Sequence, residues 1–486
     1  MQRIKIHYIM ELIGRNKEIK ELENLYRSDS PEFVAVYGRR RVGKTFLIKE
    51  LFRDRLTFWH TGLSPFDRDK THLLRDQLLA FFYSLQDYGL HGCQCPKTWL
   101  EAFRLLQQLL IEKDDGSRQL IFIDEMPWMD TARSRFIPAF EYFWNGWASK
   151  RNNIMLVVCG SATSWIENNL INNKGGLYNR LTAEIKLSPF SLRETELFFR
   201  RKNIAMRRYE IATAYMVFGG IPHYLNLFEK GLSMAQNVDN LMFAKNAKLR
   251  IEFERLFGSL FKNADDHIKV VRCLATRRGG YTRKEILEKT GIKDGGDASK
   301  IIRGLQESDF ITEYRPFGGG NIPRYKLTDQ FCLFYLQFVD KKSKNDTQFW
   351  QKNNLSPHLN AWRGLAFEHL CFAHISQIKS KLGISGVTSS ESAWIVENDG
   401  KPQSQIDMLI DRSDNVVNLC EIKFYNKAFA IDGKYDEILR NRIQTLVEAI
   451  PPSKTVYLTF IASFGLSENE YSGQVQNVVT LDDLFG

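Results

Sequence analysis

The sequence predicts an α/β protein, and three observations support this fold class. A glycine-rich loop at residues 38–45 lies between an apolar run and a helical run. A second apolar run, at residues 119–125, ends in two carboxylates. A pair of runs at residues 405–423 carries two acids and a lysine at short spacing. Strands that are buried on both faces of a parallel sheet are continuous apolar runs of this kind.

The first expected elements are a strand at residues 33–37, a loop, and a helix at residues 46–52. The loop fits the pattern G-x-x-x-x-G-K-[ST] without a mismatch, and its residues are Gly38, Arg39, Arg40, Arg41, Val42, Gly43, Lys44 and Thr45. Backbone N–H groups of such a loop point at phosphate oxygens, and the helix N-terminus adds partial positive charge. Lys44 is expected to reach the β- and γ-phosphates, and Thr45 to hold Mg²⁺. The alternative is a glycine-rich turn that binds no nucleotide.

The next expected strand ends in Asp124 and Glu125. Ligands of parallel α/β sheets bind beside the carboxyl ends of the strands, so both acids are expected at the nucleotide. Asp124 would orient Mg²⁺, through water, and Glu125 would polarise the attacking water. That division of roles indicates hydrolysis rather than nucleotide storage. The alternative is an ordinary strand end with solvated acids.

Two further residues complete the expected nucleotide site. A strand at residues 154–161 ends in Ser161, which can sense the γ-phosphate or hold the attacking water. Arg180 lies in a loop before an extended stretch at residues 183–187. From there an arginine can reach the γ-phosphate of a neighbouring subunit, which implies a homo-oligomer. The alternative for Arg180 is a solvated surface arginine.

The order of these motifs resembles that of the archaeal-type ATPases, which are related to the AAA+ and signal-transduction (STAND) ATPases. The resemblance covers the first half of the chain, from residues 13–15 to residues 220–222. It implies a P-loop NTPase fold with a helical lid over residues 1–255, with ATP and Mg²⁺ as cofactors. It also implies that Gly14 and Arg15 lie beside the base, that Pro222 packs on adenine, and that Arg180 is an arginine finger.

Composition restricts the class of protein. Of 486 residues, 43% are hydrophobic and 26% are charged, which is ordinary for a globular protein. No apolar run approaches the roughly 20 residues of a membrane helix, and residues 1–7 lack the apolar core of a signal peptide. Seven cysteines without zinc-finger spacing predict reduced thiols and a cytoplasmic location. The net charge of +10 favours an acidic partner such as nucleic acid, and no membrane partner is expected.

Residues 256–345 are predicted to form a winged helix. A first amphipathic helix spans residues 268–275. Thr282 and Glu285 form a capping box that opens a second helix at residues 286–290, and Asp297 is expected to cap a third helix at residues 298–307. The wing is expected to consist of two strands, residues 310–315 and 324–327, around the glycines at residues 318–320.

Two basic residues of the third helix, Lys300 and Arg303, lie on its more polar face. In a winged helix this is the face of the recognition helix, so both residues are expected to touch DNA. The alternative is a module that only transmits motion between the ATPase and the rest of the chain.

Residues 405–410 and 416–423 are expected to pair as antiparallel strands around a turn at residues 413–415. Such a pair can bring Asp407 near Glu421. Glu421 and Lys423 are two residues apart, so they point to the same face. Two carboxylates beside a lysine can hold Mg²⁺, which would activate water, while Lys423 would position the nucleophile. The alternative is a hairpin with solvated charges on one face.

The set Asp407, Glu421-x-Lys423 is similar to the PD-(D/E)xK family of restriction-like nucleases, with Ile406 in place of the proline. The resemblance implies a restriction-endonuclease-like domain over residues 346–486. It also makes Glu368 a further candidate metal ligand, because residues 363–368 look like the first helix of the family.

Two classes of function compete on this basis. The first is an ATP-regulated, Mg²⁺-dependent nuclease that acts on foreign DNA. The second is a STAND-like regulatory ATPase whose C-terminal domain binds nucleic acid or protein without cleavage. A transcriptional regulator that uses the winged helix is a third possibility.

Overall fold

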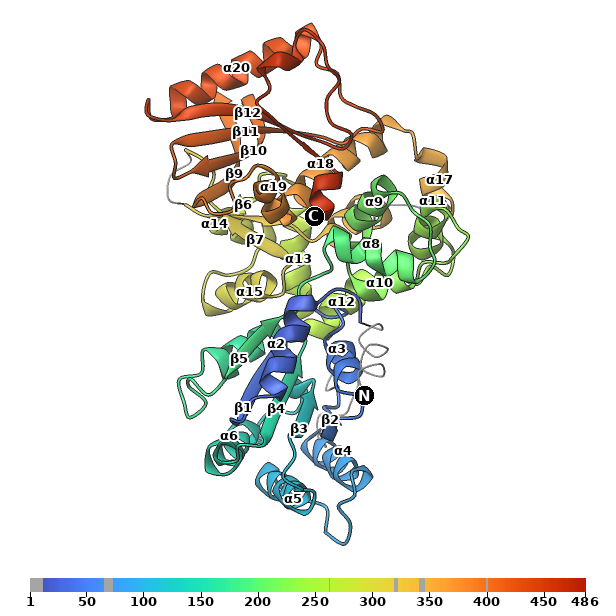
Figure 1. Ribbon diagram of the computed structural model, residues 1–486, viewed down its shortest axis with the longest axis vertical. Coiled ribbons are helices and arrows are strands. Elements are labelled where there is room, and N and C mark those ends of the chain that lie inside the picture. The colour runs from blue at the N-terminus through green and yellow to red at the C-terminus, as the bar shows by residue number, and fades with distance from the viewer. Residues whose placement is uncertain (1–11, 65–72, 262, 319–321, 341–345, 399–400) are drawn as a thin grey trace. The chain divides into compact units, whose positions relative to one another are not determined.

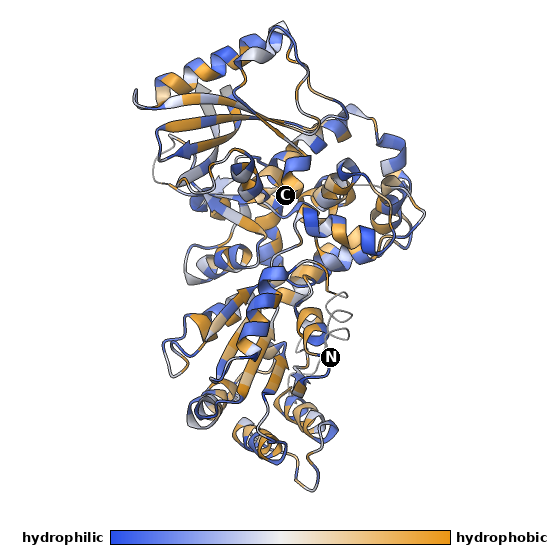
Figure 2. Ribbon diagram, viewed as in Figure 1, coloured by the Kyte–Doolittle hydropathy of each residue, from blue (hydrophilic) through white to orange (hydrophobic). Residues whose placement is uncertain are grey.

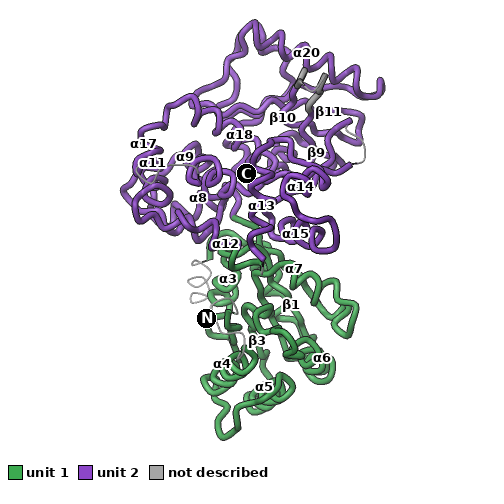
Figure 3. Tube along the Cα trace, turned by 180° about the vertical axis from the view of Figure 1, so that it is seen from behind, with its two compact units in different colours: residues 1–189, 258–262 green, residues 190–257, 263–486 purple. Residues whose placement is uncertain are grey.

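The computed structural model describes residues 12–64, 73–261, 263–318, 322–340, 346–398 and 401–486, without the side chains of residues 395–404. The chain divides into two compact units (Figure 3). Unit 1 comprises residues 1–189 and 258–262, and unit 2 comprises residues 190–257 and 263–486. The predicted wing glycines Gly319 and Gly320, and the N-terminal residues 1–7, lie outside the described residues.

Unit 1 is an α/β layer structure with a parallel sheet (Figure 1). Its described strands run in the order β2-β3-β4-β1-β5, and every pair of neighbours is parallel. This confirms the predicted fold class for the first part of the chain. Its elements are α2 (Asn16–Tyr26), β1 (Glu32–Tyr37), α3 (Lys44–Leu51), β2 (Leu56–Thr61), α4 (Leu73–Asp87), α5 (Trp99–Glu112), β3 (Gln119–Asp124), η1 (Met126–Trp128), α6 (Phe136–Gly146), η2 (Ala148–Lys150), β4 (Ile154–Gly160), α7 (Thr163–Ile166), η3 (Glu167–Ile171) and β5 (Ala183–Lys186).

The sheet is apolar because its central strands are covered on both faces. Every residue of β1, β3 and β4 is buried, and Figure 2 shows these strands in the colours of hydrophobic residues. Helices α4, α5 and α6 pack on one face through an aromatic cluster that includes Phe81, Phe103 and Phe140. The buried core fixes the carboxyl ends of β1, β3 and β4, where the candidate site residues lie.

Unit 2 begins with helices α8 (Leu192–Arg201), α9 (Arg208–Phe218), α10 (Pro222–Asn226), α11 (Met234–Val238) and η4 (Asp239–Phe243). Helix α12 (Glu252–Leu260) begins in unit 2, and its last residues, from 258 on, belong to unit 1. An ATPase with a helical lid was expected over residues 1–255, and in the structure residues 190–257 group with the later segments of unit 2. The proposed boundaries at residues 255 and 345 stay predictions.

The middle segment of unit 2 contains the elements expected for residues 256–345. They are α13 (Ala264–Leu274), β6 (Tyr281–Thr282), α14 (Arg283–Thr290), α15 (Gly296–Glu307), β7 (Ile311–Tyr314) and β8 (Arg324–Leu327). The strands form an antiparallel sheet in the order β6-β8-β7. The capping box of Thr282 and Glu285 is present at α14, as predicted.

The predicted N-cap of the third helix is wrong. Helix α15 begins at Gly296 with Gly295 as its N-cap, so Asp297 lies inside the first turn. Its carboxylate instead accepts a hydrogen bond from the ammonium of Lys300 at 3.1 Å. A carboxylate in the first turn still favours the helix through the positive end of its dipole.

The C-terminal segment contains a second sheet, in the order β13-β12-β11-β10-β9. Strands β9, β10 and β11 pair antiparallel, and β12 and β13 continue in parallel to β11. Helix α18 contacts β11, and α20 contacts β10 and β12. The elements are α16 (Gln330–Phe334), η5 (Tyr335–Val339), α17 (Phe349–Asn353), α18 (Pro357–Ala373), α19 (Ile375–Lys381), β9 (Ser389–Asn398), β10 (Lys401–Arg412), β11 (Val416–Lys423), α20 (Gly433–Ala449), β12 (Thr455–Ala462), η6 (Ser472–Gln474), β13 (Asn477–Thr480) and η7 (Asp482–Phe485).

No described helix is long and apolar enough to cross a membrane. The seven cysteines are all free thiols.

Candidate functional site

The phosphate loop connects the end of β1 to the start of α3. Gly38 has φ 135°, and a Cβ atom there would lie 2.3 Å from the carbonyl oxygen of Leu187, so the loop needs glycine at this position. Gly43 caps α3 and Lys44 is its first residue. Arg39 and Val42 are buried, and Arg40 and Arg41 are half-buried. The loop therefore packs closely against Leu187, directly after strand β5.

The ammonium of Lys44 lies across this loop. It donates hydrogen bonds to the carbonyl oxygens of Gly38 and Arg39, at 2.8 and 2.9 Å, and to Oγ of Ser161 at 3.1 Å. Among the described residues no carboxylate forms an ion pair with it. A buried cation that is held by neutral oxygens has its charge available for phosphate oxygens.

Thr45 and Asp124 form the second contact of the site. The Thr45 hydroxyl donates to Oδ2 of Asp124 at 2.9 Å, although the two residues come from different elements. Asp124 is only 3% exposed, and this burial, with the charge of Glu125, raises the pKa of its carboxyl. A hydroxyl and a carboxylate beside a phosphate loop are oxygen ligands that suit Mg²⁺, which takes its remaining ligands from phosphates and water. The residues therefore fit the expected metal.

Glu125 and Ser161 form the third contact. Oε1 of Glu125 accepts from the Ser161 hydroxyl at 2.7 Å, and Oε2 accepts from the Ser161 N–H at 3.1 Å. Glu125 has φ 46°, which turns its side chain at the end of β3. A continuous chain of hydrogen bonds thus runs from Lys44 through Ser161 to Glu125. The structure brings together these candidate residues, which follow β1, β3 and β4 in the chain, but the direct Glu125–Ser161 hydrogen bond was not expected.

Arg15 holds the loop from outside. Its guanidinium donates to the carbonyl oxygens of Ser188, at 2.6 Å, and Val42, at 3.3 Å. Gly14 and Arg15 both have positive φ, at the start of α2. These contacts give Arg15 a structural role at the phosphate loop. Its expected place beside the base stays a prediction.

Arg180 is not close to the phosphate loop of its own chain. Strand β5 is parallel to β1, with Val34 opposite Ala183. Arg180 precedes β5 and so lies near the amino end of β1, whereas the loop follows the carboxyl end. The side chain is exposed. Its action in a neighbouring subunit stays a prediction, as does the packing of Pro222, which begins α10 in unit 2.

The second candidate site is on the hairpin of β10 and β11, which the sequence predicted. Oδ2 of Asp407 accepts a hydrogen bond from the N–H of Ile422 at 3.0 Å. Lys423 donates to Oε2 of Glu421 at 3.4 Å, so these two side chains share a face. The hairpin therefore brings the two acids and the lysine to one end of the sheet.

Each acid at this site has an arginine partner that the sequence did not indicate. Arg442 of α20 and the hydroxyl of Tyr435, at 2.5 Å, both donate to Glu421, whose side chain is 0% exposed. Burial and the charge of Glu421 raise the pKa of Tyr435, so its hydroxyl stays protonated. Arg278, in the loop after α13, forms ion pairs with Glu368 and with Asp407, the latter at 3.5 Å.

These ion pairs occupy the carboxylates that were expected to hold a metal. Among the described residues, no group of three or more His, Cys, Asp or Glu side chains lies close enough together to hold a metal ion. The oxygen donors are of the right chemistry for Mg²⁺, but in this arrangement they hold guanidinium groups. The nuclease-type metal site formed by Glu368, Asp407 and Glu421 stays a prediction.

Two cavities flank the pair Glu368 and Asp407. One, of about 580 Å³, is lined by both acids and by Lys423, but not by Glu421. The other, of about 410 Å³, is lined by both acids and by basic and aromatic residues of the middle segment. The two acids therefore lie on the wall between these cavities.

The expected DNA-contacting residues lie on the solvent side of α15. Lys300 and Arg303 are both exposed, and Lys300 forms an ion pair with Asp297. Their position agrees with the predicted polar face, and their contact with DNA stays a prediction.

Comparison with known proteins finds one matching family and several similar proteins. An uncharacterized protein of Methanocaldococcus jannaschii, MJECL04, is 23% identical over 360 residues, which cover 73% of this chain and 75% of the relative. The Walker-type ATPase PABY2304 of Pyrococcus abyssi is 19% identical, with 68% of this chain and 97% of that chain covered and a TM-score of 0.46. The ORC2 protein of Aeropyrum pernix, solved as ADPNP–ADP complexes, is 13% identical, with 70% and 95% covered and a TM-score of 0.40. Residues 12–228 match the family described as an ATPase domain predominantly from Archaea.

Proposed function

We propose that this protein hydrolyses ATP in unit 1 and uses the hydrolysis cycle to regulate a metal-dependent DNA nuclease at its C-terminus. The observation that carries the proposal is the combination of two sites in one chain. The first is the chain of contacts among Lys44, Ser161 and Glu125. The second is the hairpin that gathers Asp407, Glu421 and Lys423.

The ATP site supports hydrolysis rather than binding alone. Lys44 would neutralise the β- and γ-phosphates, and Thr45 with Asp124 would hold Mg²⁺. Glu125 would orient the water that attacks the γ-phosphate, so that ADP and inorganic phosphate form. Ser161 is hydrogen-bonded to both Glu125 and Lys44. Binding of the γ-phosphate at Lys44 can therefore reposition Glu125. An oligomer in which Arg180 acts on a neighbouring site, and a cytoplasmic location, belong to the same proposal.

The architecture of unit 2 supports the nuclease part. Helix α18 carries Glu368, and the hairpin of β10 and β11 carries Asp407 and Glu421. These are the three acids that the resemblance to PD-(D/E)xK nucleases makes candidate metal ligands. Elements α13 to β8 follow the order of a winged helix, with α15 in the place of the recognition helix. Lys423 would hold the attacking water at the scissile phosphodiester, and a bound Mg²⁺ would supply charge stabilisation there.

A second function is favoured by the ion pairs of the candidate nuclease site. Arg278 and Arg442 neutralise the acids, as expected for a domain that binds a partner without cutting. In that case the protein is a STAND-like regulatory ATPase.

Cleavage assays separate the two functions. Supercoiled plasmid and a labelled single-stranded oligonucleotide would be incubated with wild-type protein in Mg²⁺ or Mn²⁺, with no nucleotide, ATP or ADP. Lys423→Met serves as the matched inactive variant, and EDTA as the metal-free control. Nicking by wild-type protein that both controls lack supports the nuclease. No cleavage under any metal and nucleotide condition supports the regulatory ATPase.

A further inference from the structure

The cavity of about 410 Å³ beside Glu368 and Asp407 contains an unusual set of charges. Four cations line it, namely Arg277, Arg278, Arg324 and Lys326. Two of them already have acidic partners, because Arg277 pairs with Glu285 and Arg278 pairs with Glu368 and Asp407. The remaining two, Arg324 and Lys326, form no ion pair with any described carboxylate. We refer to this space as the basic cavity.

Backbone geometry fixes the loop of residues 277–279 against strand β8. Gly280 has φ 61°, and a Cβ atom there would lie 2.0 Å from the carbonyl oxygen of Tyr325, so only glycine permits this approach. The hydroxyl of Tyr314 donates to the carbonyl oxygen of Gly279 at 2.6 Å. The loop cations and the strand cations are therefore held together by the fold rather than by chance side-chain positions.

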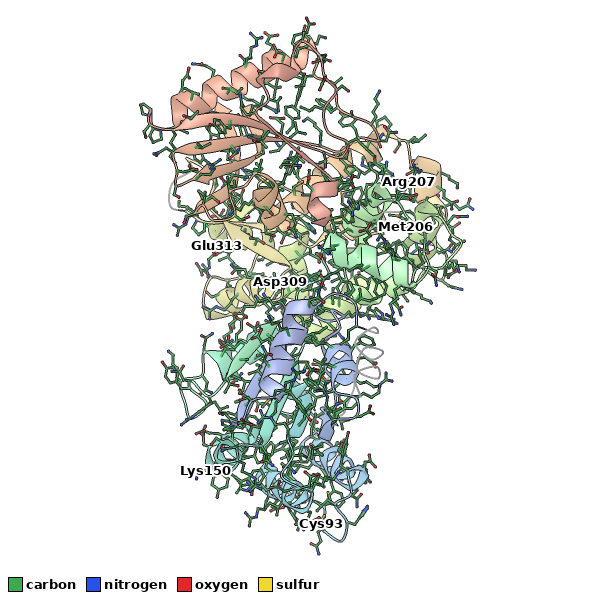
Figure 4. The ribbon with its side chains drawn as sticks, in the orientation of Figure 1. Cys93, Lys150, Met206, Arg207, Asp309 and Glu313 are labelled. Atoms are coloured by element: carbon green, nitrogen blue, oxygen red, sulfur yellow. The ribbon has the colours of Figure 1, made fainter. Side chains whose placement is uncertain are left out.

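The pleat of the sheet separates the cations from the nearest strand carboxylate. Arg324 and Lys326 are two residues apart on β8, and they pair with Tyr314 and Thr312 of β7. Glu313 lies between those two residues on β7, opposite Tyr325, so its side chain points to the other face of the sheet. Figure 4 labels Glu313 on this strand. The face that lines the basic cavity thus lacks a carboxylate from either strand.

Lys326 is half-buried and has no carboxylate partner among the described residues. Its ammonium lies 4.1 Å from the ring centroid of Phe372 and 4.9 Å from that of Tyr314, and it forms no hydrogen bond with a described residue. Burial, with a contribution from the charge of Arg278, lowers the pKa of Lys326 to about 8. Aromatic rings attract a desolvated cation, but they carry no net charge to balance it. A bound anion would supply the counter-charge that the described residues do not.

We propose that the basic cavity binds a backbone phosphate of a nucleic-acid strand, with Lys326 and Arg324 as its direct partners. The inference rests on the proposed function, because it places the strand beside Glu368 and Asp407. The cavity is larger than a phosphate group requires, and Phe317 and Trp394, whose ring centroids are 5.7 Å apart, line it as apolar wall for a sugar or base. The shared chemistry is a phosphate group, and a free nucleotide is its other source.

Binding in EDTA tests the proposal without any cleavage. The probe is a fluorescent twelve-nucleotide oligothymidylate, of a length on the order of one single-strand binding site. Its anisotropy would be measured with the full chain carrying Lys44→Ala, which removes competing phosphate binding at the ATP site. In this background Lys326→Met keeps the apolar stem against Phe372 and Tyr314 but removes the charge, and Lys326→Arg keeps the charge. Lys352→Met, at an exposed lysine of α17 that pairs with Asp346, is the matched control.

The expected result is a dissociation constant about tenfold higher for Lys326→Met, because a charge-assisted contact is lost. Lys326→Arg and Lys352→Met should bind as the background does. Equal binding by Lys326→Met overturns the proposal. Competition by thymidine monophosphate or inorganic phosphate as strong as that by unlabelled oligonucleotide also overturns it, in favour of a free-phosphate site.

The outcome is distinguishable from failure of the nuclease proposal. Binding that depends on Lys326 in a protein that cuts no substrate leaves the phosphate site standing and removes the nuclease. If Lys326→Met changes neither cleavage nor binding, the nuclease stands and the phosphate site is removed.

Discussion

Arg278 lies 3.5 Å from the carboxylate of Asp407, and the same guanidinium forms an ion pair with Glu368. One cation of the middle segment thereby pairs with two acids of the C-terminal segment. A metal ion bound between the two carboxylates would have to replace the guanidinium, because both cations would occupy the same position.

Replacement of Arg278 by alanine should make the folded state depend on divalent metal. Without the guanidinium, Glu368 and Asp407 are left close together and unpaired, which we expect to destabilise the protein by about 1–2 kcal/mol, a value reduced for the partial exposure of Arg278. Mg²⁺ or Mn²⁺ should then raise the melting temperature of the variant more than that of wild type, as measured by calorimetry. Arg272→Ala, which breaks an exposed ion pair with Asp340, is the control and should show no gain with metal. An equal metal response in both variants would contradict a metal site at these acids.

Lys423→Met should abolish cleavage with little loss of stability. Buried Glu421 keeps Arg442 and Tyr435 as partners, so removal of the Lys423 ammonium leaves no buried group without a partner. Glu421→Ala is a poorer test, because it would leave Arg442 without a counter-charge and cost about 3–5 kcal/mol. Plasmid nicking and thermal unfolding would be measured on the same preparations, together with ATP turnover, which should be unchanged. A Lys423→Met variant that still nicks DNA removes the assigned role.

Glu125→Gln should bind ATP but turn it over about 10²–10⁴-fold more slowly, because an amide cannot act as a base toward water. The amide oxygen can still accept from Ser161, so the loop geometry should survive. Lys44→Ala, by contrast, should lose ATP binding itself. Titration with a fluorescent ATP analogue and a phosphate-release assay separate the two effects. Wild-type turnover by Glu125→Gln would show that another group activates the water.

Arg180→Ala should lower ATP turnover about 10³-fold while ATP affinity stays nearly intact, if the residue acts between subunits. The exposed Lys174 of the same loop region provides a control variant, Lys174→Ala, with the same loss of charge. Turnover would be measured over a range of protein concentrations, alongside light scattering with ATP. A chain that remains monomeric and hydrolyses ATP at full rate rules the finger out.

The pair Lys300→Glu and Arg303→Glu should weaken DNA binding across many sequences, because phosphate contacts are independent of sequence. The salt dependence of the affinity should also become shallower, since fewer counterions are released. Lys284→Glu with Lys352→Glu makes the same charge change at exposed positions on other helices. Filter binding at several salt concentrations would compare the two double variants. Identical slopes would favour a middle segment that only transmits motion.

The parts of the sites that were predictable depend on short-range pattern. The phosphate loop, the strand ends at Asp124 and Ser161, and the hairpin of Asp407 and Glu421 each lie within one or two neighbouring elements, whose type follows from local periodicity. The hydrogen bond between Glu125 and Ser161 could also have been predicted from the positions of the two residues at strand ends. Both residues follow adjacent buried strands, and neighbouring parallel strands end at the same edge.

The parts that were missed depend on tertiary packing. Arg278 and Arg442 lie in a loop and a helix far along the chain from the acids they contact, and no local pattern distinguishes them from surface arginines. The error at Asp297 has a local cause. Aspartate is a preferred N-cap, but Gly295 adopts φ 155° and lets the helix begin before it.

The contact that Arg278 makes with the two acids has a thermodynamic consequence. If a divalent cation and this guanidinium exclude each other, metal affinity and the docking of residues 277–279 are linked by a single coupling free energy. Any event that lifts the loop, such as nucleotide turnover or a strand entering the basic cavity, must tighten metal binding by the same factor by which metal favours the lifted loop. The metal affinity of the two acids therefore depends on the position of the middle segment, although the acids themselves do not contact ATP.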